Sequence, residues 1–135
     1  MRVEVLNGEF LYAIRIHNDP NQGFNLCPAD ICQTPDQAFD LCPTDAPAVP
    51  ARKVEAWTPP EWIRDAVVHI CTTARLDLGG VEYLESERDG RTYLYDINAL
   101  SNFVADAPNV VGFDPFINLG DVVEQRFQQA GGKSA

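Results

Sequence analysis

The stretch GVEYLESERDGRTYLYDIN, residues 80–98, decides the predicted fold, because its turn fixes which side chains share one face of a sheet. Apolar and polar residues alternate on both sides of an Asp-Gly pair, a pattern that predicts a β-hairpin. A three-residue loop, with Gly90 in the left-handed conformation, pairs Glu82 with Asp96. A two-residue Asp-Gly turn would instead pair Glu82 with Ile97 and send the two acids to opposite faces.

With the three-residue loop, two carboxylates and the amide of Asn98 converge where the second strand ends. Carboxylates directly opposite one another repel, which destabilises a sheet unless a positive group lies between them. Mg²⁺ (or Mn²⁺) binds oxygen ligands and keeps waters and substrate phosphates in its remaining positions. We therefore expect Glu82, Asp96 and Asn98 to be metal ligands. The alternative is an exposed polar face whose acids are simply solvated.

A further hairpin is expected at the N-terminus. RVEVLNGEFLYAIRIH, residues 2–17, is broken by Asn-Gly, which predicts strands at about 2–6 and 9–17. A two-residue turn places Arg2 opposite Ala13. The core face would then hold Val3, Val5, Phe10, Tyr12, Ile14 and Ile16. The second, mostly polar face would hold Arg2, Glu4, Leu11, Ala13 and Arg15. The two arginines would give that second face local positive charge.

Two helices are expected. TPPEWIRDAVVHICTTARLDLGG, residues 58–80, has Thr58 as N-cap, Glu61 completing a capping box and a Gly-Gly pair past its end. Its buried stripe would be Trp62, Ile63, Ala66, Val67, Ile70, Cys71 and Ala74. NLGDVVEQRFQQAGG, residues 118–132, is a second helix, capped by Asn118. Its buried residues would be Leu119, Val122, Val123 and Phe127.

The order hairpin, helix, hairpin, helix predicts an α+β fold, in which helices pack on one face of an antiparallel β-sheet. A chain of 135 residues is expected to form a single domain, residues 1–135. Residues 18–57 hold most of the prolines and show no sustained period. A long loop or insert is therefore expected there.

The charge balance limits the partners. Twenty acidic and ten basic side chains give a formal net charge of -10, which disfavours nucleic acid and anionic membrane surfaces. An anionic ligand such as a nucleotide would need a few placed arginines or a metal cation. The sequence has neither an apolar run long enough to span a membrane nor the pattern of a signal peptide, so a cytoplasmic protein is expected.

Three of the four cysteines, with a histidine, allow a different function. Cys27, Cys32, Cys42 and His17 could form a zinc module, although the second of the usual paired cysteine knuckles is missing. The alternative is that these cysteines remain thiols and pack as small apolar side chains beneath the loop.

The segments LDLGGVEYLE and YLYDINALSNF resemble the C-terminal part of the ATP-grasp superfamily, in particular its RimK-like ligases, and RVEVLNGEFLYAI is similar to the preceding strand pair. The resemblance implies a C-terminal ATP-grasp subdomain that binds ATP and magnesium. The implied magnesium ligands are Glu82, Asp96 and Asn98. The implied contacts to ATP phosphates are Arg2, Arg15 and Asn25. The implied contacts to the acceptor substrate are Ser101 and Asn102.

The same resemblance implies an ATP-dependent carboxylate-amine (or similar) ligase that acts through an acylphosphate on a small-molecule or peptide substrate. The N-terminal ATP-grasp half of the same protein is then a missing partner, and this chain is expected to be inactive alone because half of the nucleotide clamp is absent. A small interaction domain that keeps the fold without catalysis is the alternative. Surface left open by the missing half could then drive formation of a homodimer.

Overall fold

The computed structural model describes residues 1–17, 53–99 and 101–131. The chain divides into two compact units, Met1–Arg15 with Val54–Ala135 and, separately, Ile16–Lys53. The first unit contains the three helices of the described residues, whereas nearly all of the second lies outside those residues. The expected single domain stays a prediction. Within the described residues, no helix is long and apolar enough to cross a lipid bilayer.

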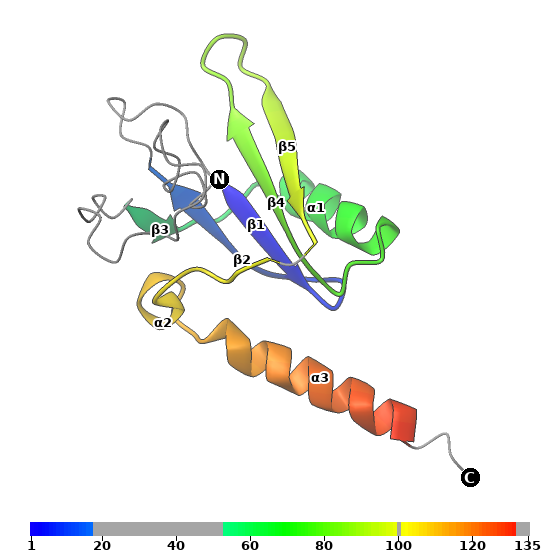
Figure 1. Ribbon diagram of the computed structural model, residues 1–135. Helices are drawn as coiled ribbons and strands as arrows, with labels where there is room; N and C mark the ends of the chain where they lie inside the picture. The colour runs from blue at the N-terminus through cyan, green and yellow to red at the C-terminus, as the bar shows by residue number, and fades with distance from the viewer. Residues whose placement is uncertain (18–52, 100, 132–135) are drawn as a thin grey trace, which may run out of the picture. The chain divides into compact units, whose positions relative to one another are not determined.

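Five strands form one sheet, in the order β3-β2-β1-β4-β5 (Figure 1). The strands are β1 (Arg2–Leu6), β2 (Glu9–Ile16), β3 (Val54–Ala56), β4 (Leu78–Glu85) and β5 (Thr92–Asn98). The helices are α1 (Glu61–Thr73), α2 (Ala107–Val110) and α3 (Pro115–Gly131). The predicted fold class, an antiparallel sheet with helices in an α+β arrangement, is confirmed. β3 lies within the stretch that was predicted to be a loop.

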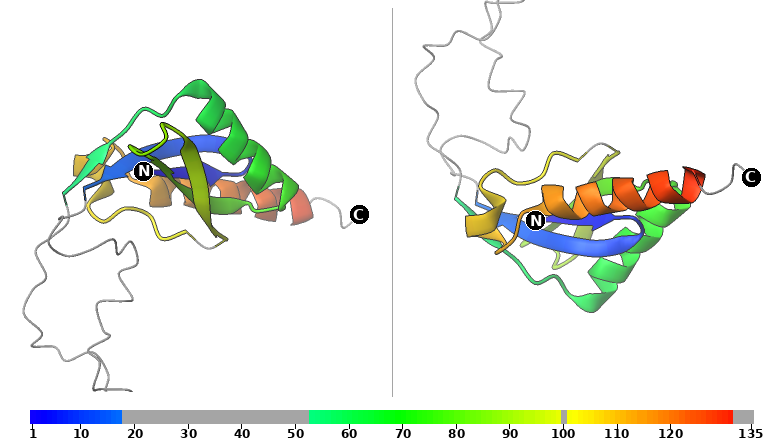
Figure 2. Two further views of the ribbon diagram at one scale, coloured as in Figure 1. Left: turned by 90° about the horizontal axis from the view of Figure 1, so that it is seen from above. Right: turned by 90° about the horizontal axis from the view of Figure 1, so that it is seen from below.

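The two long helices lie along opposite faces of the sheet (Figure 2). α1 packs onto one face and closes the main apolar core. α3 runs along the other face, beside the β1–β2 hairpin. The expected helical layer on one face is therefore formed by α1. α3 covers part of the opposite face.

The first hairpin has the predicted turn but not the predicted register. Asn7 and Gly8 have φ angles of 52° and 81°, as a two-residue hairpin turn with two left-handed residues requires. A β-bulge further along the pair shifts the register by one residue, so that Arg2 lies opposite Ile14 and not Ala13.

This shift corrects the predicted faces. Ala13 pairs with Val3 and is buried in the core beneath α1, whereas the sequence pattern placed it on the polar face. Tyr12 pairs with Glu4 on the opposite face, and both of these side chains are buried. The second face is therefore not mostly polar, because part of β2 is covered there as well.

The second hairpin reaches the predicted pairing by a different route. Its loop has four residues and not three, since the Ser86 N–H bonds to the Arg91 carbonyl at 2.8 Å. The glycine of the Asp-Gly pair takes the predicted left-handed conformation, with φ of 69°. A β-bulge then adds Tyr95 as an extra residue in β5 and brings Glu82 opposite Asp96. The longer loop shifts the register by one residue, and the bulge shifts it back.

α1 is shorter than predicted at both ends. It begins at Glu61, not near Thr58, because its first hydrogen bonds run to the Pro60 carbonyl and no side chain caps it. It ends at Thr73 because Arg75 takes a left-handed conformation, with φ of 57°, and turns the chain. The Gly-Gly pair expected just beyond the helix belongs to β4.

The core beneath α1 is apolar and closed. Its buried members are Val3, Val5, Ala13, Ile63, Val67, Cys71, Val81 and Tyr83. The Tyr83 hydroxyl, which would be costly to bury alone, accepts a hydrogen bond from Trp57 Nε1 at 2.7 Å. Trp62 and Ala74, predicted to belong to the buried stripe, are exposed. A helix lying on a sheet buries a narrower stripe than its apolar spacing suggests.

α3 begins at Pro115, three residues before the predicted cap Asn118. Asp114 is the residue that caps it, because its Oδ1 accepts the Phe116 N–H at 3.0 Å. Phe116 also packs edge-to-face on Phe103, with ring centroids 4.9 Å apart. These contacts fix the first turn of the helix to the loop that follows β5.

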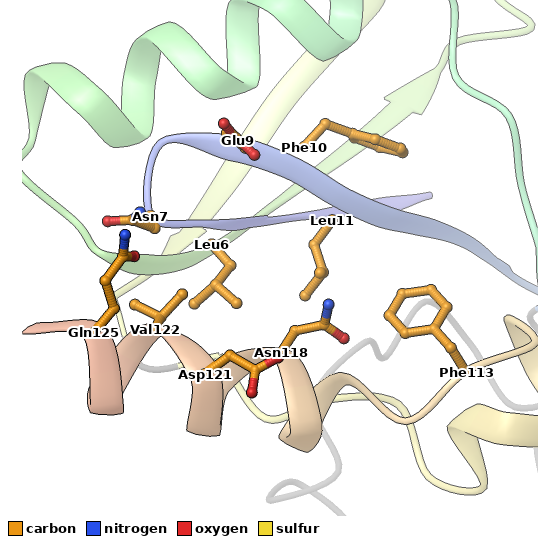
Figure 3. A pocket seen from close by; sticks show the side chains of 10 residues that line it. All are labelled: Leu6, Asn7, Glu9, Phe10, Leu11, Phe113, Asn118, Asp121, Val122 and Gln125. Carbon is orange, nitrogen blue, oxygen red and sulfur yellow. The ribbon is translucent and has the colours of Figure 1, made fainter.

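Beyond its first turn, α3 lies loosely on the sheet. A hollow of about 640 Å³ lies between the helix and the first hairpin. Leu6 points from the hairpin toward Val122 of α3, and Leu11 points toward Asn118 (Figure 3). Val123 and Phe127 were predicted to be buried, yet 59% and 79% of their surfaces are exposed. The sheet contacts only one edge of this helix, so most of its apolar side chains remain uncovered.

Candidate functional site

Two rows of side chains cross the strands β1, β4 and β5 on the face of the sheet opposite α1. Their members, strand by strand, are Arg2, Glu82 and Asp96 in the first row and Glu4, Gly80 and Asn98 in the second. Cross-strand partners share a face, and so do residues two apart along one strand. We call this surface, together with Ser101 from the loop after β5, the acidic face.

The structure brings together the three predicted metal ligands. Glu82 lies opposite Asp96, and Asn98 follows two residues later on the same side of β5. The Asn98 amide donates to Asp96 Oδ2 at 2.9 Å. The Tyr95 hydroxyl donates to Glu82 Oε2 at 3.0 Å. Glu82 is 7% exposed and Asp96 is exposed, so the group opens to solvent along β5.

The chemistry of these donors suits a hard cation. The described residues contain no group of three or more His, Cys, Asp or Glu side chains that could hold a metal ion. The protein ligands available here are two carboxylates and one amide. Such a small oxygen set fits Mg²⁺, which usually keeps several waters and is bound through one or two carboxylates and substrate phosphates.

Glu4 lies at the β1 end of the second row and is fully buried. Its Oε1 accepts hydrogen bonds from Arg2 Nε at 2.5 Å and from the Ser101 hydroxyl at 2.7 Å. Another nitrogen of the Arg2 guanidinium donates to the Ser101 hydroxyl and, at 2.5 Å, to the Asn102 carbonyl. Arg2 is thus bonded directly to Ser101 and Asn102, which the sequence assigned to the acceptor substrate, and Glu4 bonds to both Arg2 and Ser101.

The loop after β5 is held at a further point. The Tyr12 hydroxyl accepts the Val104 N–H at 3.0 Å. Burial raises the pKa of Tyr12 to about 12. This phenol therefore stays protonated at neutral pH. Together with the contacts of Arg2 and Glu4, it ties the loop to β1 and β2.

The charges of the acidic face perturb one another. Burial raises the pKa of the Glu4 carboxyl above its ordinary value of 4.5, and the Arg2 guanidinium and the Ser101 hydroxyl offset only part of that rise. The nearby charge of Glu82 adds to it. Burial, followed by the Glu82 carboxylate, also raises the pKa of Tyr95. Both shifts have the direction expected where acids crowd together away from water.

Arg15 does not belong to the acidic face, contrary to the prediction. It follows Ile14, the partner of Arg2, and side chains alternate along a strand, so Arg15 points to the opposite side. Its guanidinium lies 4.2 Å from the centre of the Trp57 ring. The shift of register in the first hairpin separates the two arginines, and only Arg2 lies beside the acids.

Several predicted residues fall outside the described ranges. Asn25, assigned to ATP phosphates, is one of them, and so are Cys27, Cys32 and Cys42 of the possible zinc module. His17 is described, and its backbone N–H bonds to the Lys53 carbonyl at 2.9 Å. These assignments remain predictions.

Sequence reasoning missed Glu4 and Tyr95. Glu4 was placed on a solvated polar face, and its burial depends on Ser101, which is 97 residues away in the chain. Tyr95 reaches Glu82 only because it is the extra residue of a bulge. In RVEVL the acid alternates with two valines as it does in an ordinary half-exposed strand, so the local sequence contained no signal for the burial of Glu4.

The comparisons with known proteins bear on the fold. No family model and no curated protein matches the sequence. Among solved structures, the chain is similar to one described as "Structure of ATP-grasp ligase PsnB complexed with minimal precursor". The TM-score is 0.61 at 17% sequence identity, and the match covers 93% of this chain and 35% of that chain. The chain therefore has an ATP-grasp-like fold.

Proposed function

We propose that this chain is the nucleotide- and magnesium-binding part of an ATP-dependent carboxylate-amine (or similar) ligase of the RimK-like type. It would work with the N-terminal ATP-grasp half of the same protein and be inactive alone. The substrates would be ATP and a small-molecule or peptide carboxylate and amine. The observation that carries the proposal is the row of Arg2, Glu82 and Asp96, which places one guanidinium and two carboxylates on neighbouring positions of three strands.

Four residues of the acidic face would have a defined task. Glu82, Asp96 and Asn98 would hold Mg²⁺ (or Mn²⁺), which neutralises charge on the β- and γ-phosphates when it is bound. Arg2, whose side chain keeps 18% exposure, would contact a phosphate oxygen. The metal ion and the Arg2 guanidinium would supply the positive charge that a chain with a net charge of -10 needs to bind a nucleotide.

Binding of Mn²⁺ to the chain itself tests the proposal without any substrate. Electron paramagnetic resonance counts free Mn²⁺ during a titration. We expect one site in the wild type and at least about tenfold weaker binding in Asp96→Asn, which removes one ligand charge. Asp65→Asn removes the same charge from an exposed position on α1 and should change the affinity less than about twofold.

The proposal fails if the wild type binds no Mn²⁺, or if Asp96→Asn and Asp65→Asn bind it as the wild type does. ADP added to the Mn²⁺-loaded chain then tests the nucleotide step. Retention of ADP that is lost in Arg2→Ala would support the phosphate contact.

One observation favours the alternative of an interaction domain. α3 exposes large apolar side chains, and 64% of Phe116, 64% of Ile117 and 79% of Phe127 are accessible. Sedimentation velocity would detect a homodimer. A dimer that Phe127→Glu abolishes, in a chain that binds no Mn²⁺, would favour interaction over ligation.

A further inference from the structure

Glu4 has no task in the proposed function, yet it is among the most buried side chains of the protein. None of its surface is exposed, although it lies on the acidic face and not in the apolar core. Its Oε1 accepts two hydrogen bonds, whereas Oε2 is buried and has no hydrogen-bond partner in the described part of the chain. Burying a carboxylate with one unsatisfied oxygen opposes folding. Stability alone therefore does not account for Glu4.

The contacts of Glu4 lead to the predicted ligands. Oε1 lies between Arg2 Nε and the Ser101 hydroxyl and holds both groups in one orientation. Ser101 stands three residues after Asn98, the last residue of β5. The segment that leaves the metal-ligand edge is thus fixed, a few residues later, to a buried carboxylate on β1.

The backbone is fitted to this arrangement at Gly80. Gly80 lies between Glu4 and Asn98 in the second row. A Cβ at this position would stand 2.7 Å from Ser101 Oγ and 2.9 Å from Glu4 Oε2, closer than real Cβ atoms approach. Only glycine leaves room for the Glu4 and Ser101 side chains to meet above β4.

We propose that Glu4 is a positioning residue. Its buried carboxylate fixes the Arg2 guanidinium and, through Ser101, the end of β5 that carries Asp96 and Asn98. Glu4 touches neither cation nor phosphate in this scheme. The inference rests on the proposed function and extends it, because the strength of cation binding at Glu82, Asp96 and Asn98 then depends on a residue outside the ligand set.

Mn²⁺ affinity in two variants tests the proposal. Glu4→Gln keeps the shape of the side chain but removes its charge, and Ser101→Ala removes no charge and breaks the link between Glu4 and the loop. We expect each to weaken Mn²⁺ binding about tenfold, the low end of the effect of losing a residue that orients a metal ligand. An effect of charge alone would weaken binding in Glu4→Gln and leave Ser101→Ala unchanged.

The control variant is Val67→Ala, which opens a cavity in the core beneath α1 without touching the acidic face. Affinities are measured at a temperature where circular dichroism shows each variant folded. Wild-type affinity in Val67→Ala with loss in both test variants supports the proposal. Wild-type affinity in Ser101→Ala, or equal loss in Val67→Ala, overturns it.

A direct readout comes from the Arg2 side chain. In the wild type the Nε–H that bonds to Glu4 should give a protected NMR signal, and Glu4→Gln should shift it and speed its exchange with water. An unchanged signal contradicts the positioning role. The proposed function fails separately, in the comparison of Asp96→Asn with Asp65→Asn, where Glu4 is intact, and the inference then falls with it.

Discussion

The α1 face and the acidic face share strands β1 and β4, and they are held together by different forces. Beneath α1, apolar side chains from β1, β2 and β4 meet the stripe of Ile63, Val67 and Cys71, and the buried Tyr83 hydroxyl has a partner. On the acidic face, a buried carboxylate, an arginine and a serine are joined by hydrogen bonds beside the predicted metal ligands.

The two faces should therefore contribute differently to folding stability and to the proposed binding of a metal ion. Apolar burial on the α1 face stabilises the fold in proportion to the area removed from water. The charged groups of the acidic face oppose folding unless they are paired, and Glu4 is paired through only one oxygen. Variants on the two faces should therefore have effects of different size and kind.

The largest loss of stability is expected for Ile63→Ala. Ile63 is fully buried under α1, and replacing such a side chain by alanine should lower the free energy of unfolding by about 2–5 kcal/mol. Its neighbour Trp62 is 56% exposed, so Trp62→Ala should have a much smaller effect. Urea unfolding followed by circular dichroism measures both. Equal losses would mean that α1 does not bury the stripe described above.

Gly80→Ala should disturb the acidic face without removing any polar group. The new methyl group would overlap Ser101 Oγ and Glu4 Oε2, and overpacking of this kind lowers stability by about 1–3 kcal/mol. The control is Gly120→Ala in α3, where a Cβ meets no atom of the described residues within 4 Å. That substitution should raise stability by roughly 0.5–1 kcal/mol, because alanine favours helix. A gain at both positions would contradict the close contact at Gly80.

The contrast between the faces also explains what the sequence could predict. The hairpins could be found because Asn-Gly and Asp-Gly turns are local signals, and α1 because its apolar residues recur at helical spacing. The faces of the first hairpin could not, since a single bulge beyond its turn reverses the side chains of half of β2. The pairing of Glu82 with Asp96 was predicted from a three-residue loop, and it arises from a longer loop and a bulge that cancel.

Glu4 could not be found for a related reason. Local alternation places it on a face that β1 and β2 alone would leave solvated. Its burial requires the pairing of β1 with β4 and the return of the chain after β5, and both are contacts between residues far apart in the sequence. Whether a charged strand residue is buried is decided by tertiary structure, which periodicity does not report.

The pH dependence of stability offers a test of the Glu4 environment. Its pKa is raised above 4.5, so the folded chain holds this proton more tightly than the unfolded chain does. The resulting stabilisation is fully present below pH 4.5 and is lost as the pH rises through the folded pKa. Relative to Glu4→Gln, which does not titrate at this position, the wild type should lose stability as the pH rises from 4.5, by at most about 1.4 kcal/mol per pH unit.

Urea unfolding at several pH values measures the difference between the two proteins, and the other titrating groups largely cancel in it. A difference that stays constant would show that the Arg2 contact balances burial, and one that grows in favour of the wild type as the pH rises would show that the contact outweighs it.

The smallest effect on stability is expected in the second half of α3. An exposed ion pair attaches this part of the helix to the sheet, whereas an apolar core attaches α1. Arg126 donates to Asp77 Oδ1 at 2.7 Å and to Asn7 Oδ1 at 2.8 Å, and both charged side chains are more than half exposed. Surface pairs of this kind contribute at most about 1 kcal/mol, so Arg126→Ala should barely change global unfolding. It should instead speed amide hydrogen exchange in the second half of α3 and leave α1 unchanged. Faster exchange in α1 as well would mean that the two faces of the sheet are coupled more closely than their separate contacts indicate.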